Sequence, residues 1–209
     1  MTITFIERVI QNYAQGLPGR EHQRKMAVLA RYRTMEAPVT ARKACVLLLL
    51  FPKAGEWHVL LTERTSSDNP NMRHSGQISF PGGKLEADDV SLEACALRET
   101  HEEVGILQNS IKIIGQMTDL YIPVSNFQVF PFLAWTDSTP QYFPQISEVQ
   151  DVIEVPLSIL QNSKNIKMKD MRINDELILT DVPYFDVYGR TVWGATAMIL
   201  SEFLSLLKP

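Results

Sequence analysis

The amino-acid sequence predicts an α/β fold of the α+β kind, in which a few helices cover one mixed β-sheet and a helical arm precedes them. Two patterns predict it: helical periodicity in the first forty residues, and short apolar runs of strand length from residue 44 onward. The 209 residues are 45% apolar and 21% charged, which is typical of a soluble globular protein. We therefore expect an arm at residues 1–40 and one domain at residues 41–209.

The arm has the pattern of two helices. Apolar residues recur at helical spacing in the first of them: Phe5, Ile6, Val9, Ile10 and Tyr13. The run Leu17-Pro18-Gly19 interrupts this helix, and a second, basic helical pattern extends from Arg20 to Arg33. Its cations either meet an anionic substrate or form a solvated helix face, and the sequence leaves both interpretations open.

The rest of the chain predicts strands separated by turns, with two helices among them. Ala44–Phe51 is apolar throughout, as expected for a central strand. Further strands are predicted at Trp57–Thr62, Ile78–Phe80, Ile111–Met117, Phe127–Ala134, Val149–Val155, Ile166–Ile173, Leu177–Thr180 and Tyr184–Val187. The helices are predicted at Ser91–Val104, with Gly105 as its C-terminal stop, and at Ala195–Leu207.

Composition disfavours several classes of protein. Cys45 and Cys95 lie in apolar stretches without CxxC spacing, so we expect reduced core residues of a cytoplasmic protein. No apolar run reaches the roughly 18 residues of a membrane span. A net charge of −4 disfavours a protein that coats nucleic acid. The expected partner is a small molecule, with no nucleic acid and no membrane, and a homodimer stays open.

The end of the first predicted domain helix carries the strongest functional signal. Residues 98–105 read Arg-Glu-Thr-His-Glu-Glu-Val-Gly. At 100° per residue, one side is apolar and the opposite side holds three carboxylates within about 100°. The apolar residues are Ala94, Leu97 and Val104, and the carboxylates are Glu99, Glu102 and Glu103. Because like charges at this spacing repel each other, a hard cation such as Mg²⁺ or Mn²⁺ would stabilise this face.

A solvated acidic face balanced by Arg98 is the plain alternative to a metal site. The pair Gly82-Gly83 before the helix favours the metal site, because glycines form tight turns whose backbone can approach a phosphate closely. His101 projects on the apolar side, so we expect a partly buried histidine there rather than a ligand.

These segments resemble the signature of the Nudix hydrolase family. Its second half, Arg-Glu-apolar-x-Glu-Glu-x-Gly-apolar, matches residues 98–106, with Thr100 at an apolar position. Counted from Gly83, its first half is one residue too long, so the early acidic position falls at Asp88 or Asp89, with Glu86 also open. The resemblance implies an α/β/α sandwich around a mixed sheet.

The resemblance also implies roles for the acidic helix. Glu99, Glu102 and Glu103 would bind Mg²⁺ or Mn²⁺, and Arg98 would hold the first carboxylates by an ion pair. Nudix enzymes often place one more catalytic carboxylate on a loop, and Glu148 stands in such a segment. The base that takes the proton of the attacking water is either Glu99 or Glu148. The implied catalytic residues are Arg98, Glu99, Glu102 and Glu148.

Upstream segments resemble the coenzyme A pyrophosphatase branch of the family. Residues 60–66 read Leu-Leu-Thr-Glu-Arg-Thr-Ser, and residues 73–83 end in Phe-Pro-Gly-Gly. The second arginine of the branch falls at Met72 here, and Arg73 follows one position later. The implied substrate-binding residues are Arg64, Arg73, Gly82 and Gly83. A guanidinium pairs two oxygens at once and suits phosphates, although surface pairs with Glu63 and Asp68 are the plain alternative.

The sequence thus predicts a metal-dependent hydrolase that cleaves the pyrophosphate bond of coenzyme A or its acyl derivatives. The products would be 3′,5′-ADP and 4′-phosphopantetheine or its acyl form. A Nudix pyrophosphatase for another nucleoside diphosphate derivative, such as ADP-ribose, NADH or a dinucleoside polyphosphate, is the alternative. A non-catalytic nucleotide-binding protein of the same fold is the third hypothesis.

Overall fold

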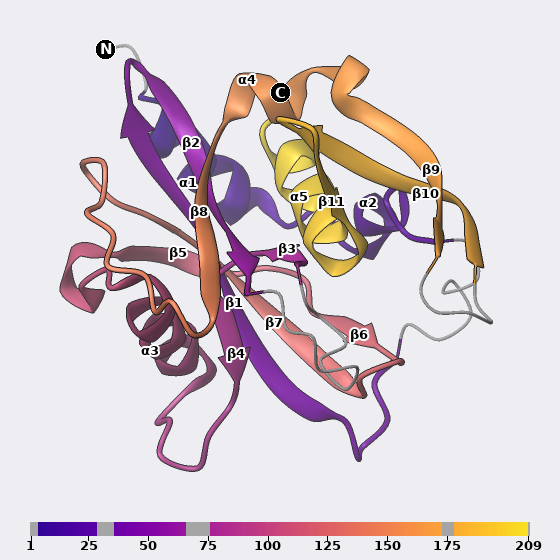
Figure 1. Cartoon of the computed structure of the whole chain (residues 1–209). Coiled ribbons are helices and arrows are strands. Elements are labelled where there is room, and N and C mark those ends of the chain that lie inside the picture. The colour runs from indigo at the N-terminus through magenta and orange to yellow at the C-terminus, as the bar shows by residue number, and fades with distance from the viewer. Residues whose placement is uncertain (1–3, 29–35, 66–75, 173–177, 209) are drawn as a thin grey trace.

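The computed structural model describes residues 4–28, 36–65, 76–172 and 178–208. It has the expected mixed α+β fold, with helices on both faces of a mixed sheet (Figure 1). The larger sheet contains β1 (Arg42–Lys53), β2 (Glu56–Arg64), β3 (Ile78–Ser79), β4 (Gly82–Lys84), β5 (Lys112–Gln116), β6 (Leu120–Ile122), β7 (Phe127–Trp135) and β8 (Val149–Pro156). Its order is β3-β2-β1-β7-β5, while β4 pairs with β1, β6 with β7 and β8 with β2.

The central strand is β1, and both of its faces are buried. Leu48 and Leu50 belong to one hydrophobic core, whereas Leu47 and Leu49 belong to the other. This explains the uninterrupted apolar run, because alternate side chains enter opposite cores. β1 runs parallel to β7 and antiparallel to β2 and β4, which makes the sheet mixed.

The helices form two layers around this sheet. They are α1 (Phe5–Gln15), α2 (Arg20–Arg24), α3 (Leu92–Val104), α4 (Leu157–Gln161) and α5 (Gly194–Leu206), with short 3₁₀ turns at Gln108–Ser110 and Ser163–Asn165. Residues of α3 enter the core on one face of the sheet, and residues of α1, α4 and α5 enter the core on the other. In Figure 1, α3 accordingly lies on the opposite side of the larger sheet from α1 and α5.

The prediction of one mixed sheet is incomplete, because β9, β10 and β11 form a second, three-stranded sheet in the order β11-β10-β9. Its strands are β9 (Ile166–Arg172), β10 (Ile178–Val187) and β11 (Arg190–Trp193). The two strands predicted at residues 177–180 and 184–187 are therefore one strand. Its register shifts between Leu179 and Val182, where Asp181 has a φ of 51°. A β-bulge interrupts the alternation that sequence analysis relies on, so the single strand looked like two.

Other departures from the predicted elements concern short segments. β4, β6, β11 and α4 were not predicted, because each is too short to show a period. The second helix of the arm ends at Arg24 rather than extending to Arg33, and residues 29–35 lie outside the described part. No helix within the described ranges is long and apolar enough to cross a membrane.

The arm packs against the rest of the chain. Ile6 and Val9 of α1 are buried in the core that α5 lines. The Tyr13 hydroxyl donates to the Gln116 carbonyl at 2.8 Å and lies over Gly115, where an added Cβ would stand 2.1 Å from that hydroxyl. The division of the chain at residues 40 and 41 stays a prediction.

We predict that Gly115→Ala lowers the free energy of unfolding by about 1–3 kcal/mol, because the new methyl group collides with the Tyr13 ring. Denaturant unfolding of Gly115→Ala, Tyr13→Ala and the double variant forms a cycle that isolates this contact. The double variant should lose less than the two single losses added together. Strict additivity would show that Tyr13 and Gly115 do not interact.

Candidate functional site

The acidic helix α3 has well-defined ends. The Ser91 hydroxyl accepts the Ala94 N–H at 3.0 Å at its start, and Gly105, with a φ of 74°, ends it in the left-handed conformation. Gly105 was predicted as this stop, and the prediction is confirmed. Glycine reaches positive φ without strain, so the chain can leave the helix abruptly here.

The buried face of α3 differs from the predicted one. Its buried residues are Cys95, Ala96, Thr100, Glu103 and Val104. The predicted apolar side was centred on Leu97, which is only half-buried, and the prediction of a partly buried His101 is wrong because that residue is exposed. The helix approaches the sheet through small side chains, and the Thr100 hydroxyl is satisfied by the Ala96 carbonyl at 2.7 Å. The true face is therefore turned toward Glu103.

Glu103 points into the protein and is only 3% exposed. Its Oε2 accepts the Gly82 N–H at 3.1 Å, and its Oε1 lies 3.7 Å from Nη1 of Arg64. Burial raises the pKa of Glu103 from 4.5 to about 7, although Arg64 and the Gly82 N–H act in the opposite direction. Arg64 and the Gly82 N–H offset only part of the cost of burying this negative charge. A bound cation would offset the rest and favour the ionised carboxylate.

Glu99 lies directly over Gly83. The tight turn predicted at Gly82 and Gly83 is wrong, because both residues belong to strand β4. A Cβ added to Gly83 would stand 2.4 Å from Oε2 of Glu99, so a larger residue here would displace this carboxylate. Gly83 is opposite Cys45 on β1, so the glycine pair is fixed to the central strand. Burial raises the pKa of Glu99, and Arg98 opposes that effect. The carboxylates of Glu99 and Glu103 therefore both meet the glycine pair Gly82 and Gly83 of β4.

Arg98 joins three acidic residues. It donates to Asp89 at 2.8 and 2.9 Å, to Glu99 at 3.0 Å and to Glu102 at 2.8 Å. The two bonds to Asp89 hold the pKa of that carboxyl well below its usual range. Of the three acidic residues considered for the early position of the signature, Asp89 is therefore the one paired with Arg98.

Glu102 is the most exposed of the three helix carboxylates, with 56% of its side chain accessible, and it is turned toward Arg98. Within the described residues, no three Asp, Glu, His or Cys side chains already converge as a ligand set. The carboxylates of Glu99 and Glu103 lie at the same glycine pair. Because the Glu102 side chain is exposed, it is free to rotate toward them. This donor set consists of oxygens, which Mg²⁺ and Mn²⁺ prefer.

The loop that carries Glu148 is attached to the end of α3. Its Phe143 and Gln145 N–H groups donate to the Val104 and Glu103 carbonyls, each at 2.9 Å. Gly105 packs against the Phe143 backbone, where an added Cβ would come within 3.0 Å. Glu148 is exposed, and its charge contributes to raising the pKa values of Glu99 and Glu103. The structure thus brings Glu148 to the same site as the helix carboxylates.

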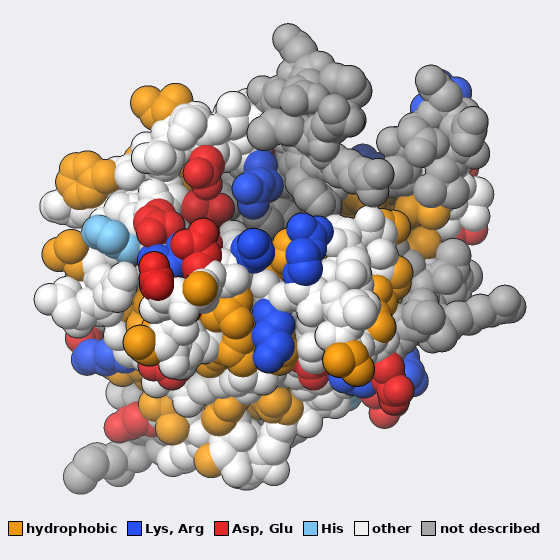
Figure 2. Space-filling view, turned by 90° about the horizontal axis from the view of Figure 1, so that it is seen from below, with side chains coloured by type: hydrophobic (Ala, Val, Ile, Leu, Met, Phe, Trp, Pro, Cys, Tyr) orange, Lys and Arg blue, Asp and Glu red, His pale blue; other side chains and the backbone are white. Residues whose placement is uncertain are grey.

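Arg64 also reaches this site, through its contact with Glu103. The suggested surface pair of Arg64 with Glu63 is wrong, because Glu63 instead pairs with Arg190 at 3.3 Å. Arg73 and Asp68 lie outside the described residues. Figure 2 shows acidic side chains gathered beside a group of Lys and Arg side chains on one face of the molecule.

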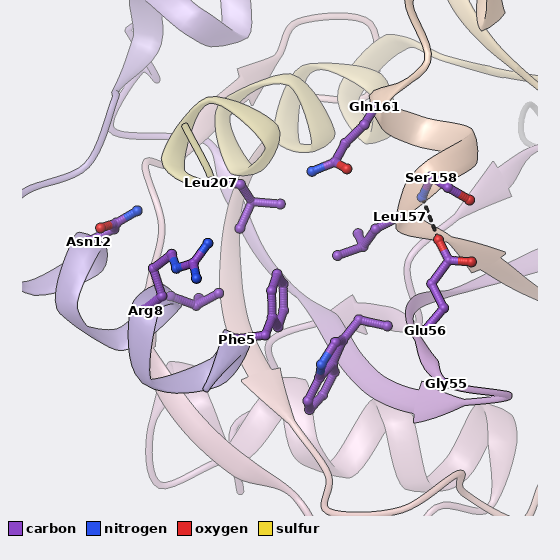
Figure 3. A pocket seen from close by; sticks show the side chains of 11 residues that line it. Phe5, Arg8, Asn12, Gly55, Glu56, Leu157, Ser158, Gln161 and Leu207 are labelled. Atoms are coloured by element: carbon purple, nitrogen blue, oxygen red, sulfur yellow. Dashed lines mark hydrogen bonds between the residues drawn. The ribbon is translucent and has the colours of Figure 1, made fainter. Parts of the chain in front are cut away.

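A cleft of about 360 Å³ lies elsewhere, between α1, α4 and the turn that joins β1 to β2. Phe5 and Trp57 stack in it with ring centroids 5.2 Å apart, and Figure 3 shows Arg8 and Gln161 beside the same opening. Its lining includes none of the carboxylates described above. The cleft is therefore separate from the candidate site.

Comparisons with known proteins agree with this geometry. The family model for the NUDIX domain matches residues 41–172. A probable Nudix hydrolase of Schizosaccharomyces pombe is 34% identical over 169 residues, which cover 80% of this chain and only 57% of that protein. An uncharacterized Nudix hydrolase, NudL, of an Enterobacter strain is 33% identical over 80% of this chain and 84% of its own length.

Among solved structures, a MutT/Nudix family protein from Enterococcus faecalis superposes with a TM-score of 0.51. The match covers 88% of this chain and 71% of that one, at 14% sequence identity. At this identity the similarity shows a common fold.

We predict that Glu103→Gln stabilises the metal-free protein. The folded-state pKa of Glu103 lies above its ordinary value, so ionisation costs stability fully above pH 7 and not below pH 4.5. In EDTA at pH 8 the variant should gain about 1–3 kcal/mol in denaturant unfolding, and at pH 4.5 its stability should equal that of the wild type. A loss of stability at pH 8 would instead make the Glu103 carboxylate a structural group.

Proposed function

Because the chain belongs to the NUDIX domain family of hydrolases, we propose that it cleaves the pyrophosphate bond of coenzyme A or its acyl derivatives. The products are 3′,5′-ADP and 4′-phosphopantetheine or its acyl form. One observation supports pyrophosphate cleavage above all: Glu99 and Glu103 meet at the glycine pair of β4, and Arg64 contacts Glu103 there. The resemblance of residues 60–66 and 73–83 to the coenzyme A branch supports the choice of substrate.

Nudix enzymes generally use divalent metal cations. In this proposal Glu99, Glu102 and Glu103 hold Mg²⁺ or Mn²⁺. When bound, the metal neutralises phosphate oxygens and lowers the pKa of a water molecule. The residues fit such a group, because Glu99 and Glu103 meet the same glycine pair at a location where burial penalises carboxylates without a cation, and Glu102 is exposed beside them.

The arginines position the reacting groups. Arg98 pairs with both Glu99 and Glu102, and its Nη2 also donates to the Lys84 carbonyl of β4, so it ties the helix carboxylates to the sheet. Arg64 is half-exposed and contacts Glu103 at 3.7 Å, which is a long ion pair. Its guanidinium therefore keeps capacity to pair with the oxygens of a pyrophosphate.

Glu148 acts as the general base in this proposal. Among the described residues its carboxylate has no hydrogen-bond or ion-pair partner, whereas Glu99 is engaged by Arg98 at 3.0 Å. A carboxylate without a partner is the better acceptor for a proton. The loop bonds to the α3 carbonyls position Glu148 relative to the metal-binding helix.

One feature of the sequence favours a second candidate. Met72 occupies the place of the branch arginine, and a Nudix enzyme for another nucleoside diphosphate derivative would not need that arginine. A non-catalytic binding protein is disfavoured, because it would gain nothing from the mutually repelling glutamates of α3.

We predict metal-dependent release of 3′,5′-ADP from coenzyme A. The purified chain should be incubated with coenzyme A, ADP-ribose, NADH and diadenosine compounds, each with Mg²⁺, with Mn²⁺ or with EDTA, and the products identified by mass spectrometry. Coenzyme A should give the highest kcat/KM, and EDTA should abolish turnover. A higher kcat/KM for ADP-ribose or NADH would assign the chain to the second candidate.

We predict that Glu148→Gln lowers kcat about 10²- to 10⁴-fold with little change in KM, because it removes the proton acceptor and preserves shape. Glu93→Gln is the matched control, since Glu93 is an exposed glutamate at the other end of α3. A kcat within about threefold of the wild type would return the base role to Glu99.

A further inference from the structure

Two exposed cations lie beside the glycine pair of β4, on the face of the sheet opposite to α3. Lys84 is opposite Ala44 in the pairing of β4 with β1, and Arg42 precedes Ala44 by two residues. Residues two apart on a strand share a face, so Arg42 and Lys84 are diagonal neighbours. Lys and Arg side chains gather beside the acidic group on the surface that Figure 2 shows.

Arg42 is held in place without a carboxylate. Its Nη2 donates to the Ser125 carbonyl at 2.8 Å, and its guanidinium carbon lies 4.1 Å from the centroid of the Phe127 ring. Among the described residues it forms no ion pair. The side chain is therefore ordered and keeps its charge available, which lowers the entropic cost of binding an anion.

Lys84 is placed by the catalytic segment itself. It follows Gly83, over which Glu99 lies, and its carbonyl accepts Nη2 of Arg98 at 3.3 Å. Its ammonium has no ion-pair partner among the described residues, although Glu86 and Asp88 follow closely in the chain. The positive charges of Arg42 and Lys84 are thus not used to neutralise neighbouring acids.

The spacing fits a ligand with two separate anionic groups. Cys45 is opposite Gly83, and Arg42 lies three residues earlier on β1, which corresponds to roughly 10 Å along the strand. The 3′- and 5′-phosphates of a nucleotide are closer together than this, and the long side chains of Arg42 and Lys84 can reach across the difference. The metal-binding glutamates and Arg64 would bind one anionic group of such a ligand. None of these residues is placed to bind its second anionic group.

We propose that Arg42 and Lys84 form a second anion subsite, which binds a phosphomonoester of the substrate outside the scissile pyrophosphate. This inference rests on the proposed function, because it assigns the pyrophosphate to the metal-binding glutamates. In coenzyme A the group is the 3′-phosphate of the ribose. The subsite selects nucleotides that carry this extra phosphate over those that lack it.

The direct test is ligand binding without metal. The dissociation constants of 5′-AMP and 3′,5′-ADP for the full chain are measured by calorimetry in EDTA, and their ratio is compared between variants. The wild type should prefer 3′,5′-ADP about tenfold or more, as a charge-assisted contact allows. Arg42→Gln and Lys84→Ala should each reduce this preference about three- to tenfold, and Lys84→Glu should abolish it.

Lys43→Ala is the matched control. Lys43 is an exposed lysine on the same strand as Arg42, but it belongs to the face that α3 covers, opposite to the face of Arg42 and Lys84. The ratio should stay unchanged in this variant. An equal effect of Lys43→Ala, or an equal loss of affinity for 5′-AMP and 3′,5′-ADP in the other variants, would overturn the subsite.

Turnover separates this inference from the proposed function. If coenzyme A and its dephospho form are cleaved with equal kcat/KM and the binding preference is absent, the subsite fails and the function stands. If coenzyme A is not cleaved, but the preference for 3′,5′-ADP depends on Arg42 and Lys84, the function fails and the subsite stands.

Discussion

The close contact between α3 and the glycine pair of β4 is the constraint on which the rest of the site depends. Side chains at Gly82 and Gly83 would collide with the β1 backbone and with the Glu99 carboxylate, respectively. Their absence lets the helix approach β4, so that Glu103 reaches the Gly82 N–H while Cys95 and Ala96 pack on the sheet below. The same contact therefore determines how α3 packs on the sheet and brings the carboxylates of Glu99 and Glu103 to one location.

This location is electrostatically unfavourable without a ligand. Arg98 pairs with Asp89, Glu99 and Glu102 but not with Glu103, which Arg64 reaches only at 3.7 Å. Glu103 is left with a raised pKa in a buried position, and the charge of Glu148 adds to the repulsion. A protein selected for stability alone would place an apolar residue there. The arrangement is consistent with stability traded for affinity toward a cation, as in many functional sites.

Much of the fold and the identity of the acidic helix followed from sequence patterns, because a long apolar run and a well-capped helix are local signals. The orientation of α3 did not follow, because small residues such as Ala96 and Thr100 dominate its buried face while Leu97 is only half-buried. The pairing of Arg98 with Asp89 needed the turn geometry, since the loop is one residue longer than the signature. The attachment of the Glu148 loop to α3 could not be predicted, because it is made by backbone N–H groups that almost any residue carries.

The arm is connected to the rim of the site through a buried hydrogen-bond network. Glu202 of α5 is fully buried and accepts from the Thr118 hydroxyl at 2.5 Å, the Gly19 N–H at 3.2 Å and the Gln23 amide at 2.8 Å. The same amide donates to the Thr118 carbonyl at 2.8 Å. Thr118 precedes β6, whose turn into β7 supplies the Ser125 carbonyl that holds Arg42. A buried carboxylate is stable only while its hydrogen-bond donors are in place. Loss of α2 would therefore remove donors from Glu202, and the segment from Thr118 to Ser125 that orders Arg42 would become less rigid.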